Sequence, residues 1–529
     1  MSVISERVWR RASFVVLLVA AILRLYDLKL KPLHSDEGVN GFFVTRLFHQ
    51  GFYQYDPANY HGPTLYYFAL FTSTANSLFF GRHGLSTFAI RLVPVLFGIA
   101  TVWLVLQLRR EVGAIGALAA AALVGVSPGS VYFSRDFIHE TPFAFFTLAL
   151  VVAALRYSQS AQPVYLMLAS ASAALLFATK ETAVISSVVL LLALLCTVAY
   201  VRQRKSGRPD GAPVDNRPRR DTPPEGNATA VSRLRSRLDR FGGTSHLVVL
   251  SLVAILLFLN GIVLFYSSFF SQPRSVHAAA ETFRFWVKTS QTAHRHPWYE
   301  YLRWLGQEEL PLLLLGATGA ALAVWRACNR FALFAGLWAI GLLAAYSLVP
   351  YKTPWLTLNF LVPLAITGGY AVEVIAGMGG QGGKGRGPKI ALALVAAALG
   401  VSAYQAIRLN FYHYDDDRYP YVYAQTRRAF LGLVEQIHAR AARAGTGEQT
   451  TVTITSPDYW PLPWYLREYK NVGYHGRINA PNEAIVVGSE KQEPLLRLLL
   501  AGKYQRIDSY PLRPGVNLVL FVRRTAPGP

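Results

Sequence analysis

Two adjacent carboxylates, Asp36 and Glu37, follow the first apolar segment of the chain, within the stretch 31–38. Each negative charge raises the pKa of the other, and a low-dielectric membrane surface raises it further. A carboxylate with a raised pKa can act as a general base near neutral pH. The alternative is a solvated loop that merely ends a helix, and the acidic pair alone does not decide between the two.

Five further polar clusters lie near the ends of apolar segments, at 61–63, 132–140, 179–181, 294–299 and 351–355. Ionisable residues near membrane depth are functional candidates by default. Arginine can hold a phosphate as a fork and lysine as a point charge, while a nearby carboxylate can deprotonate a hydroxyl. The combination suits group transfer from a lipid phosphate. The candidate binding residues are His61, Arg135, Asp136, Glu140, Lys180, Glu181, His296, Trp298, Lys352 and Trp355.

Each cluster also has a purely structural interpretation. Arg135 could pair with Asp136 or Glu140. Lys180 and Lys352 could extend from span ends to the membrane surface. His294 and His296, in the cluster at 294–299, could be interface residues. Trp298 and Trp355 could anchor the chain at the membrane interface. A His/Asp/Glu set could also bind a divalent cation, although the spacing fits no defined metal motif.

The elements that must position these clusters are membrane helices. The chain has 529 residues, of which 52% are hydrophobic, in long apolar runs. Runs of about 20 apolar residues are typical of membrane helices. The net charge of +22 could suggest nucleic acid, but much of the surplus lies between apolar runs, as in cytoplasmic loops that face anionic lipid. We therefore expect no nucleic-acid partner. Cys196 and Cys328 are expected to be free thiols.

Hydropathy predicts about eleven spans. They fall at about 12–30, 87–108, 113–131, 138–157, 163–179, 181–201, 245–267, 310–327, 330–349, 355–376 and 390–408. Three arginines precede the first span, which has no small-residue cleavage site after it, so we expect an uncleaved anchor with a cytoplasmic N-terminus. The protein is predicted to be a multi-pass protein of the cell (inner) membrane.

The predicted fold is an α-helical polytopic domain over 1–408, followed by a small extracytoplasmic α/β domain over 409–529. Within the first domain, 202–243 is expected to be a disordered basic cytoplasmic linker and 268–309 an outer loop. The segment 64–80 is expected to lie along the outer surface as a juxtamembrane helix that caps the site. In the second domain, helices are expected at 424–444 and 494–501, and strands at 450–455, 484–487 and 516–522.

Several of these motifs, in this order, resemble the integral-membrane GT-C glycosyltransferases of the protein O-mannosyltransferase and lipid A aminoarabinose transferase type. The motifs are His34-Ser35-Asp36-Glu37, His61-Gly62-Pro63-Thr64-Leu65-Tyr66-Tyr67, Arg91-Leu92-Val93-Pro94, Ser127-Pro128 with Ser134-Arg135 and Glu140, Thr179-Lys180, and His296-Pro297-Trp298. Tyr351-Lys352-Thr353-Pro354-Trp355 and the stretch 460–467 resemble more closely a prokaryotic branch often labelled flippase-activity-associated protein.

The resemblance implies transfer of a sugar, with inversion, from a polyprenyl-phosphate-linked donor in the membrane lipid to a hydroxyl acceptor at the outer face. Asp36 would be the base, and Glu37 would orient the acceptor or the loop. The leaving phosphate would be held by Arg135 and Lys180, with His296 and Lys352 as further candidates. No cofactor is implied with certainty.

Asp136 directly follows Arg135, where the familiar enzymes usually have an apolar residue, so either Asp136 or Glu140 would do the second acidic task. A rival hypothesis is a non-catalytic membrane protein that binds lipid-linked sugars or assists their translocation, which needs the basic pocket but not the base. An ion-coupled transporter would instead place paired charges at mid-membrane, whereas these charges lie at span ends.

Overall fold

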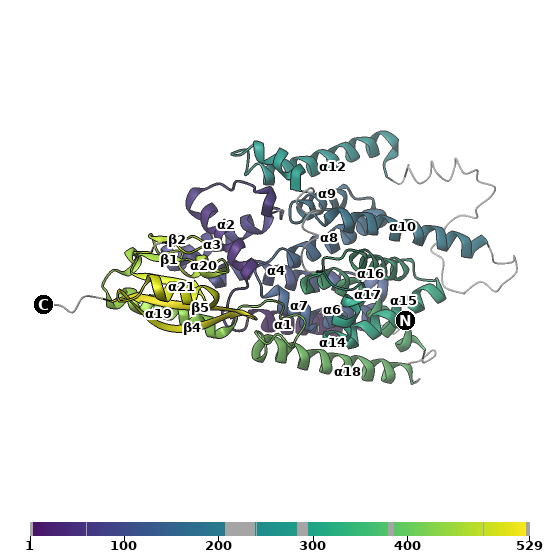
Figure 1. Cartoon of the computed structure of the whole chain (residues 1–529). Helices are drawn as coiled ribbons and strands as arrows, with labels where there is room; N and C mark the ends of the chain where they lie inside the picture. The colour runs from purple at the N-terminus through teal and green to yellow at the C-terminus, as the bar shows by residue number, and fades with distance from the viewer. Residues whose placement is uncertain are drawn as a thin grey trace.

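The computed structural model describes residues 4–59, 61–206, 239, 241–282, 295–378, 386–479 and 481–524. It consists of a helical bundle with a small sheet domain at one end, and the N-terminus lies toward the opposite end (Figure 1). Termini at opposite ends agree with an odd number of crossings, while the side that faces the cytoplasm stays a prediction. Most of the predicted basic linker 202–243 lies outside the described residues.

Long apolar helices build most of the bundle, and two short helices, α7 (Pro128–Ser134) and α14 (Glu300–Glu308), precede or follow bends in it. The others are α1 (Glu6–Leu25), α4 (Thr87–Leu106), α6 (Ala114–Val126), α8 (Glu140–Ser160), α9 (Pro163–Phe177), α10 (Ala183–Ser206), α12 (Gly243–Tyr266), α15 (Leu310–Arg326), α16 (Arg330–Leu348), α17 (Leu358–Gly377) and α18 (Gly387–Ile407). Seven helices in the described part of the chain are long and apolar enough to span a membrane, or up to nine if the bent pairs α6–α7 and α14–α15 each form one span. Each of the eleven predicted spans overlaps a helix. Two helices that overlap predicted spans are not among these nine: α1 carries charges at both ends, and α9 has only 15 residues.

Helix α17 lies at the centre of the bundle, where glycines let the neighbouring backbones approach closely. A Cβ at Gly319 of α15 would lie 1.8 Å from the carbonyl oxygen of Thr367, and one at Gly369 would lie 2.1 Å from that of Gly116 in α6. This packing fixes the start of α17, and with it the preceding turn Pro354–Thr357, which also contacts α7 and α14.

Two helices lie between the bundle and the sheet domain, namely α2 (Ser35–Gln50) and α3 (Thr64–Phe80). The bounds of α3 are those predicted for the juxtamembrane helix. Helix α2 was not predicted, because Asp36 and Glu37 were expected in a loop. The structure places both acids in the first turn of α2, where His34 and Glu37 form a capping box.

The C-terminal domain contains a five-stranded mixed sheet in the order β2-β1-β3-β5-β4. The strands are β1 (Val452–Ile454), β2 (Val472–Tyr474), β3 (Ile485–Ser489), β4 (Tyr504–Arg513) and β5 (Val516–Arg523). Three of these strands match the predicted ones, and α19 (Leu431–Arg443) and α21 (Glu493–Leu499) match the predicted helices. Strands β2 and β4 were missed. The short helix α20 (Leu462–Tyr465) joins this domain to α2.

Candidate active site

A cavity of about 540 Å³ lies where the bundle, α2 and the C-terminal domain meet. Its ionisable and amide lining comprises His34, Asp36, Asn40, Asn59, His61, His139, Glu140, Lys180, Glu181 and Arg513, and its aromatic wall comprises Tyr346, Tyr351, Trp355 and Tyr423. Four of the six predicted clusters supply charged or histidine side chains to this cavity, and the cluster at 351–355 supplies aromatic ones. The predicted convergence of distant span ends is therefore what the structure shows.

Asp36 faces this cavity from the first turn of α2, and its side chain is 51% exposed. His34 orients the turn, because its Nδ1 accepts a hydrogen bond from the Asp36 backbone N–H at 3.1 Å. The other ring nitrogen, Nε2, then donates to the carbonyl oxygen of Tyr423 at 3.1 Å. This pair of contacts requires a neutral His34 with its proton on Nε2. Asp36 thus presents an accessible carboxylate from a fixed backbone.

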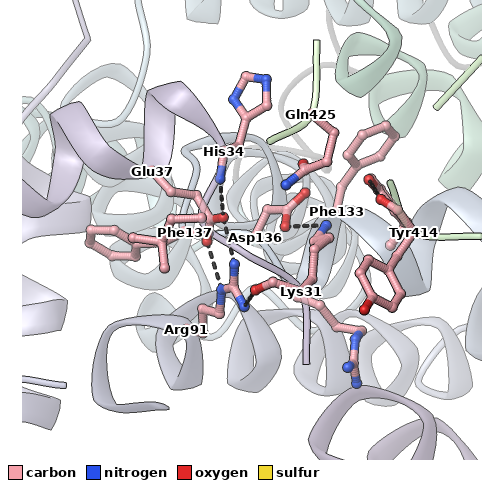
Figure 2. A network of polar contacts seen from close by, with 12 residues as sticks. Lys31, His34, Glu37, Arg91, Phe133, Asp136, Phe137, Tyr414 and Gln425 are labelled. Atoms are coloured by element: carbon pink, nitrogen blue, oxygen red, sulfur yellow. Dashed lines mark hydrogen bonds and ion pairs between the residues drawn. The ribbon is translucent and has the colours of Figure 1, made fainter. Parts of the chain in front are cut away.

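Glu37 points away from the cavity and is fully buried. Figure 2 shows its carboxylate between Arg91, the backbone of His34 and that of Phe137. Arg91 donates to both oxygens, at 2.8 and 2.7 Å, while the backbone N–H groups of His34 and Phe137 donate at 2.9 and 2.8 Å. Arg91 also donates to the carbonyl oxygens of Leu28 and Lys31. Glu37 therefore holds the loop, one of the two tasks predicted for it.

The prediction that the pKa of Glu37 is raised is wrong. Burial alone would raise this pKa, but the charge and hydrogen bonds of Arg91 outweigh burial and hold it below its usual value. A second buried pair, Lys31 and Asp136, lies beside the first (Figure 2). Burial lowers the pKa of Lys31 to about 8 and raises the pKa of Asp136. We call Lys31, Glu37, Arg91 and Asp136 the buried clamp.

Arg135 does not line the cavity. Its guanidinium donates to backbone carbonyl oxygens at the end of α1, including those of Tyr26 at 2.6 Å and Asp27 at 2.8 Å, and it stacks on Phe411. It also donates to the carbonyl oxygens of Leu23 and Arg24 in the last turn of α1, which a helix end leaves unsatisfied. Neither Arg135 nor its neighbour Asp136 therefore reaches the space that Asp36 faces, and Glu140 is the acid of this segment that does.

Lys180 and Glu140 form a buried ion pair in the cavity wall. Burial would lower the pKa of Lys180, but Glu140 and Glu181 outweigh it and hold that pKa above its usual value. Glu181 bonds to Nδ1 of His61 at 3.1 Å. Burial opposes ionisation of Glu181, yet the adjacent His61 and Lys180 lower its pKa. All four side chains line the same cavity, and they come from the predicted clusters at 61–63, 132–140 and 179–181.

Gly62 explains how these two segments meet. Its backbone N–H donates to the Thr179 carbonyl at 3.0 Å, and a Cβ at position 62 would lie 2.0 Å from the Ala178 carbonyl oxygen. Only glycine permits this approach. His139, which the sequence did not single out as a site residue, packs its ring 4.8 Å from that of His61 and bonds through Nε2 to the Gly62 carbonyl at 3.1 Å.

The remaining predicted residues line a separate, shallower pocket of about 330 Å³, which contains His296, Trp298 and Lys352. Lys352 donates through Nζ to the carbonyl oxygens of Ser347 and Val349, so it caps the end of α16. His296 packs against Tyr423, which belongs to the cavity wall. The structure thus places this cluster beside the cavity but not in it.

The C-terminal domain closes the cavity with Arg513, at the end of β4, whose guanidinium pairs with Asp458. Nothing in the sequence around Arg513 indicated that this residue would line the cavity. The same domain also supports the Asp36 turn. Tyr465 accepts from the Leu33 N–H at 3.0 Å, and the fully buried Trp464 lies against Gly41, where a Cβ would be 2.5 Å from the indole ring.

A metal site was left open by the sequence. Within the described ranges, no group of three or more His, Cys, Asp or Glu side chains lies close enough together to hold a metal ion. Cys196 and Cys328 are free, as predicted. The described cavity combines one accessible carboxylate with ion-paired cations and histidine.

These features define a multi-pass membrane protein with a charged cavity beside a small sheet domain, and comparisons with known proteins show which folds it resembles. Residues 61–207 match the family described as Dolichyl-phosphate-mannose-protein mannosyltransferase. No curated protein sequence matches the chain significantly. Among solved structures, ArnT from Cupriavidus metallidurans bound to undecaprenyl phosphate aligns with a TM-score of 0.63 at 15% identity, covering 99% of this chain and 100% of that chain.

The oligosaccharyltransferase AglB from Archaeoglobus fulgidus, in complex with an inhibitory peptide and a dolichol-phosphate, aligns with a TM-score of 0.56 at 12% identity. That alignment covers 94% of this chain and 71% of AglB. The fold is that of the GT-C membrane glycosyltransferases of the mannosyltransferase and ArnT type, as the motif resemblance predicted. The narrower resemblance to a flippase-associated branch stays a prediction.

Proposed function

We propose that this protein transfers a sugar from a polyprenyl-phosphate-linked donor to a hydroxyl acceptor at the outer membrane face. The observation that carries the proposal is the accessible Asp36 carboxylate, held on a rigid turn in a cavity that also contains Lys180 and Arg513. The GT-C fold and its likeness to an undecaprenyl-phosphate-bound ArnT support a lipid phosphate donor. In this orientation the sheet domain is extracytoplasmic and the N-terminus cytoplasmic.

Asp36 accepts the proton of the acceptor hydroxyl as its oxygen attacks C1 of the sugar. The new C1–O bond forms while the bond from C1 to the phosphate oxygen breaks, and the polyprenyl phosphate leaves with the electron pair. A single displacement inverts the configuration at C1. The developing charge on the phosphate needs a cation near it throughout this step.

Lys180 is the cation that the cavity offers from the bundle. Its Nζ donates to Glu140, and an ammonium group carries three donors, so it can bind a phosphate oxygen without releasing Glu140. Arg513 offers a planar fork from the opposite domain. Glu140 and the His61–Glu181 pair then act as positioning residues, and Trp355 and Tyr423 shape the wall that receives the sugar.

The test uses the full chain in nanodiscs containing undecaprenyl-phosphate-linked hexoses, with a panel of soluble oligosaccharides and alcohols as hydroxyl acceptors and release of undecaprenyl phosphate as the readout. Wild-type protein is expected to consume at least one donor, and Asp36→Asn is expected to consume none while it still binds undecaprenyl phosphate. Equal consumption by the variant would refute Asp36 as the base. Binding without consumption by the wild type would favour a non-catalytic carrier of lipid-linked sugars.

A further inference from the structure

A second concave surface, which we call the aromatic groove, lies where α2 meets the C-terminal domain. It encloses about 430 Å³ and is separate from the cavity that contains Asp36. Five of the residues that line it are aromatic, namely Phe42, Tyr459, Trp460, Tyr469 and Tyr474. Nothing in the transfer step proposed above uses these rings.

Four of these rings, those of Phe42, Trp460, Tyr459 and Tyr474, contact one another in a row. The centroid of Tyr459 lies 5.5 Å from that of Trp460 and 5.2 Å from that of Tyr474, and Phe42 meets Trp460 edge-on at 6.1 Å. Helix α2 packs closely against Trp460 in this row, since a Cβ at Gly38 would lie 2.7 Å from Pro461 and 3.3 Å from the indole of Trp460. Rings fixed in advance lose little entropy when a ligand binds.

The charges of the groove have one sign. Arg467 and Lys470 line it, and no carboxylate does so among its described lining residues. Arg467 is fixed, because it donates to the Trp464 carbonyl at 2.6 Å and to the Leu85 carbonyl at 3.1 Å. A surface of flat rings with phenol, indole and cationic donors at its edge suits the C–H faces and hydroxyl groups of sugar rings.

A polyprenyl chain is a poorer match for the same surface. Its branched aliphatic units are best received by branched aliphatic side chains, and only Leu466 and Val472 of that kind line the groove. The charged groups of Arg467 and Lys470 would also lie beside hydrocarbon, which is unfavourable. The composition of the groove therefore favours a carbohydrate over a lipid tail.

Helix α2 joins the groove to the cavity. Asp36 and Asn40 line the cavity from this helix, while Phe42 and Thr45 line the groove. On the other side, Tyr459 follows Asp458, whose carboxylate pairs with Arg513 in the cavity. Asp36 and Phe42 are six positions apart on α2, a rise of about 9 Å, so an extended ligand of more than one sugar ring can contact both sites.

We propose that the aromatic groove binds the carbohydrate part of the acceptor, so that its terminal hydroxyl reaches Asp36 while the preceding sugar rings stack on Tyr459 and Trp460. This assignment rests on the proposed function and makes it narrower, because the acceptor then is a glycan of more than one residue. The C-terminal domain serves as the acceptor-binding module of the protein.

The test is retention of the detergent-solubilised full chain on an array of immobilised glycans. Wild-type protein is expected to bind one class of oligosaccharide. Trp460→Ala and, as a variant that leaves the 458–467 backbone contacts in place, Phe42→Ala are expected to lower the affinity about tenfold. Tyr412→Ala is the matched control, because that ring is 66% exposed and does not line the groove.

Retention of no glycan would overturn the assignment, and so would equal retention by wild type, Trp460→Ala and Phe42→Ala. Competition by vesicles of undecaprenyl phosphate, with no effect from soluble oligosaccharide, would overturn it in favour of a lipid. The test is independent of the base, since Trp460 and Phe42 line the groove and not the cavity that contains Asp36. Glycan binding can therefore be lost while donor consumption is intact, and donor consumption can be lost while glycan binding is intact.

Discussion

The cavity and the buried clamp lie back to back on one turn of α2, and both are built from carboxylates and cations. In the clamp, Arg91 alone makes four strong contacts, two to Glu37 and two to backbone carbonyls, and its side chain is 1% exposed. In the cavity, Asp36 is half-exposed and receives only a weak contact, at 3.4 Å, from the Ser35 hydroxyl. A carboxylate whose hydrogen bonds are all made holds structure, whereas one with open lone pairs can accept a proton from a substrate.

This difference separates two residues that are adjacent in the chain. Because successive helical positions point about 100° apart, Asp36 and Glu37 cannot both face the same space. A mutual rise of pKa, which the pair alone suggests, does not develop at Glu37, because a buried guanidinium dominates its surroundings. The comparison therefore predicts that changes on the two sides of the turn damage different properties of the protein.

The largest expected effect is on activity and comes from the cavity side. Asp36→Asn removes the base, and we expect donor consumption to fall by a factor of about 10²–10⁴. The free energy of unfolding should stay unchanged, since the side chain is half-exposed and makes no strong contact. The measurement is undecaprenyl phosphate release together with thermal unfolding in detergent. A large loss of stability in this variant would mean that Asp36 belongs to the clamp.

The next largest effect is on stability and comes from the clamp. Arg91→Ala leaves Glu37 buried without its cation, and we expect a loss of about 3–5 kcal/mol in the free energy of unfolding. Arg497→Ala is the matched control, because it breaks an exposed ion pair with Glu493 and should cost about 1 kcal/mol or less. Equal losses for the two arginines, measured by denaturant unfolding in detergent, would show that the clamp contributes no more than a surface pair.

A smaller effect, on the affinity for lipid phosphate, distinguishes the cations that line the cavity from those that do not. Lys180→Met and Arg513→Ala should each weaken binding of undecaprenyl phosphate about tenfold or more, as expected for loss of a charge-assisted hydrogen bond. Arg135→Ala and Lys352→Ala should leave this affinity unchanged in the folded fraction, since both side chains bond to backbone carbonyls outside the cavity. Titration of the lipid into purified protein measures all four. Weakened binding in Arg135→Ala alone would place the phosphate at the end of α1.

Some of these structural features could be predicted from the sequence alone. The helices of the bundle could be predicted, because the bilayer sets the length of an apolar run. The meeting of the clusters at 61–63 and 179–181 could be predicted, because the first precedes the juxtamembrane helix and the second joins two spans on the same side of the membrane. The same argument identified Asp36 and Lys180 as candidates.

Side-chain direction within a turn could not be predicted in this way. Arg135 and Asp136 are neighbours, yet one bonds to the end of α1 and the other to Lys31. The hydropathy of the segment does not determine the direction in which either side chain points. Arg513 was missed for a different reason, since it lies in a strand of another domain and reaches the cavity only through the docking of Trp464 and Tyr465 on α2. Contacts of this kind depend on tertiary packing and leave no local pattern.

His139 tests the boundary between the two regions, because it lines the cavity and yet is only 1% exposed. Burial, together with the nearby His61 and Lys180, holds its pKa well below the usual value. The unfolded chain therefore binds a proton at this residue below about pH 6.5 while the folded chain does not. Stability conferred by the neutral ring is complete above that pH and is lost as the pH falls.

The expected loss is at most about 1.4 kcal/mol per pH unit below about pH 6.5. His139→Gln keeps a donor for the Gly62 carbonyl but cannot titrate, so the slope of unfolding free energy against pH should be smaller in this variant than in the wild type. The difference between the two slopes isolates His139 from the other histidines. Identical slopes between pH 5 and 6.5 would mean that the ring takes up a proton in the folded protein, and that water reaches it from the cavity as it reaches Asp36.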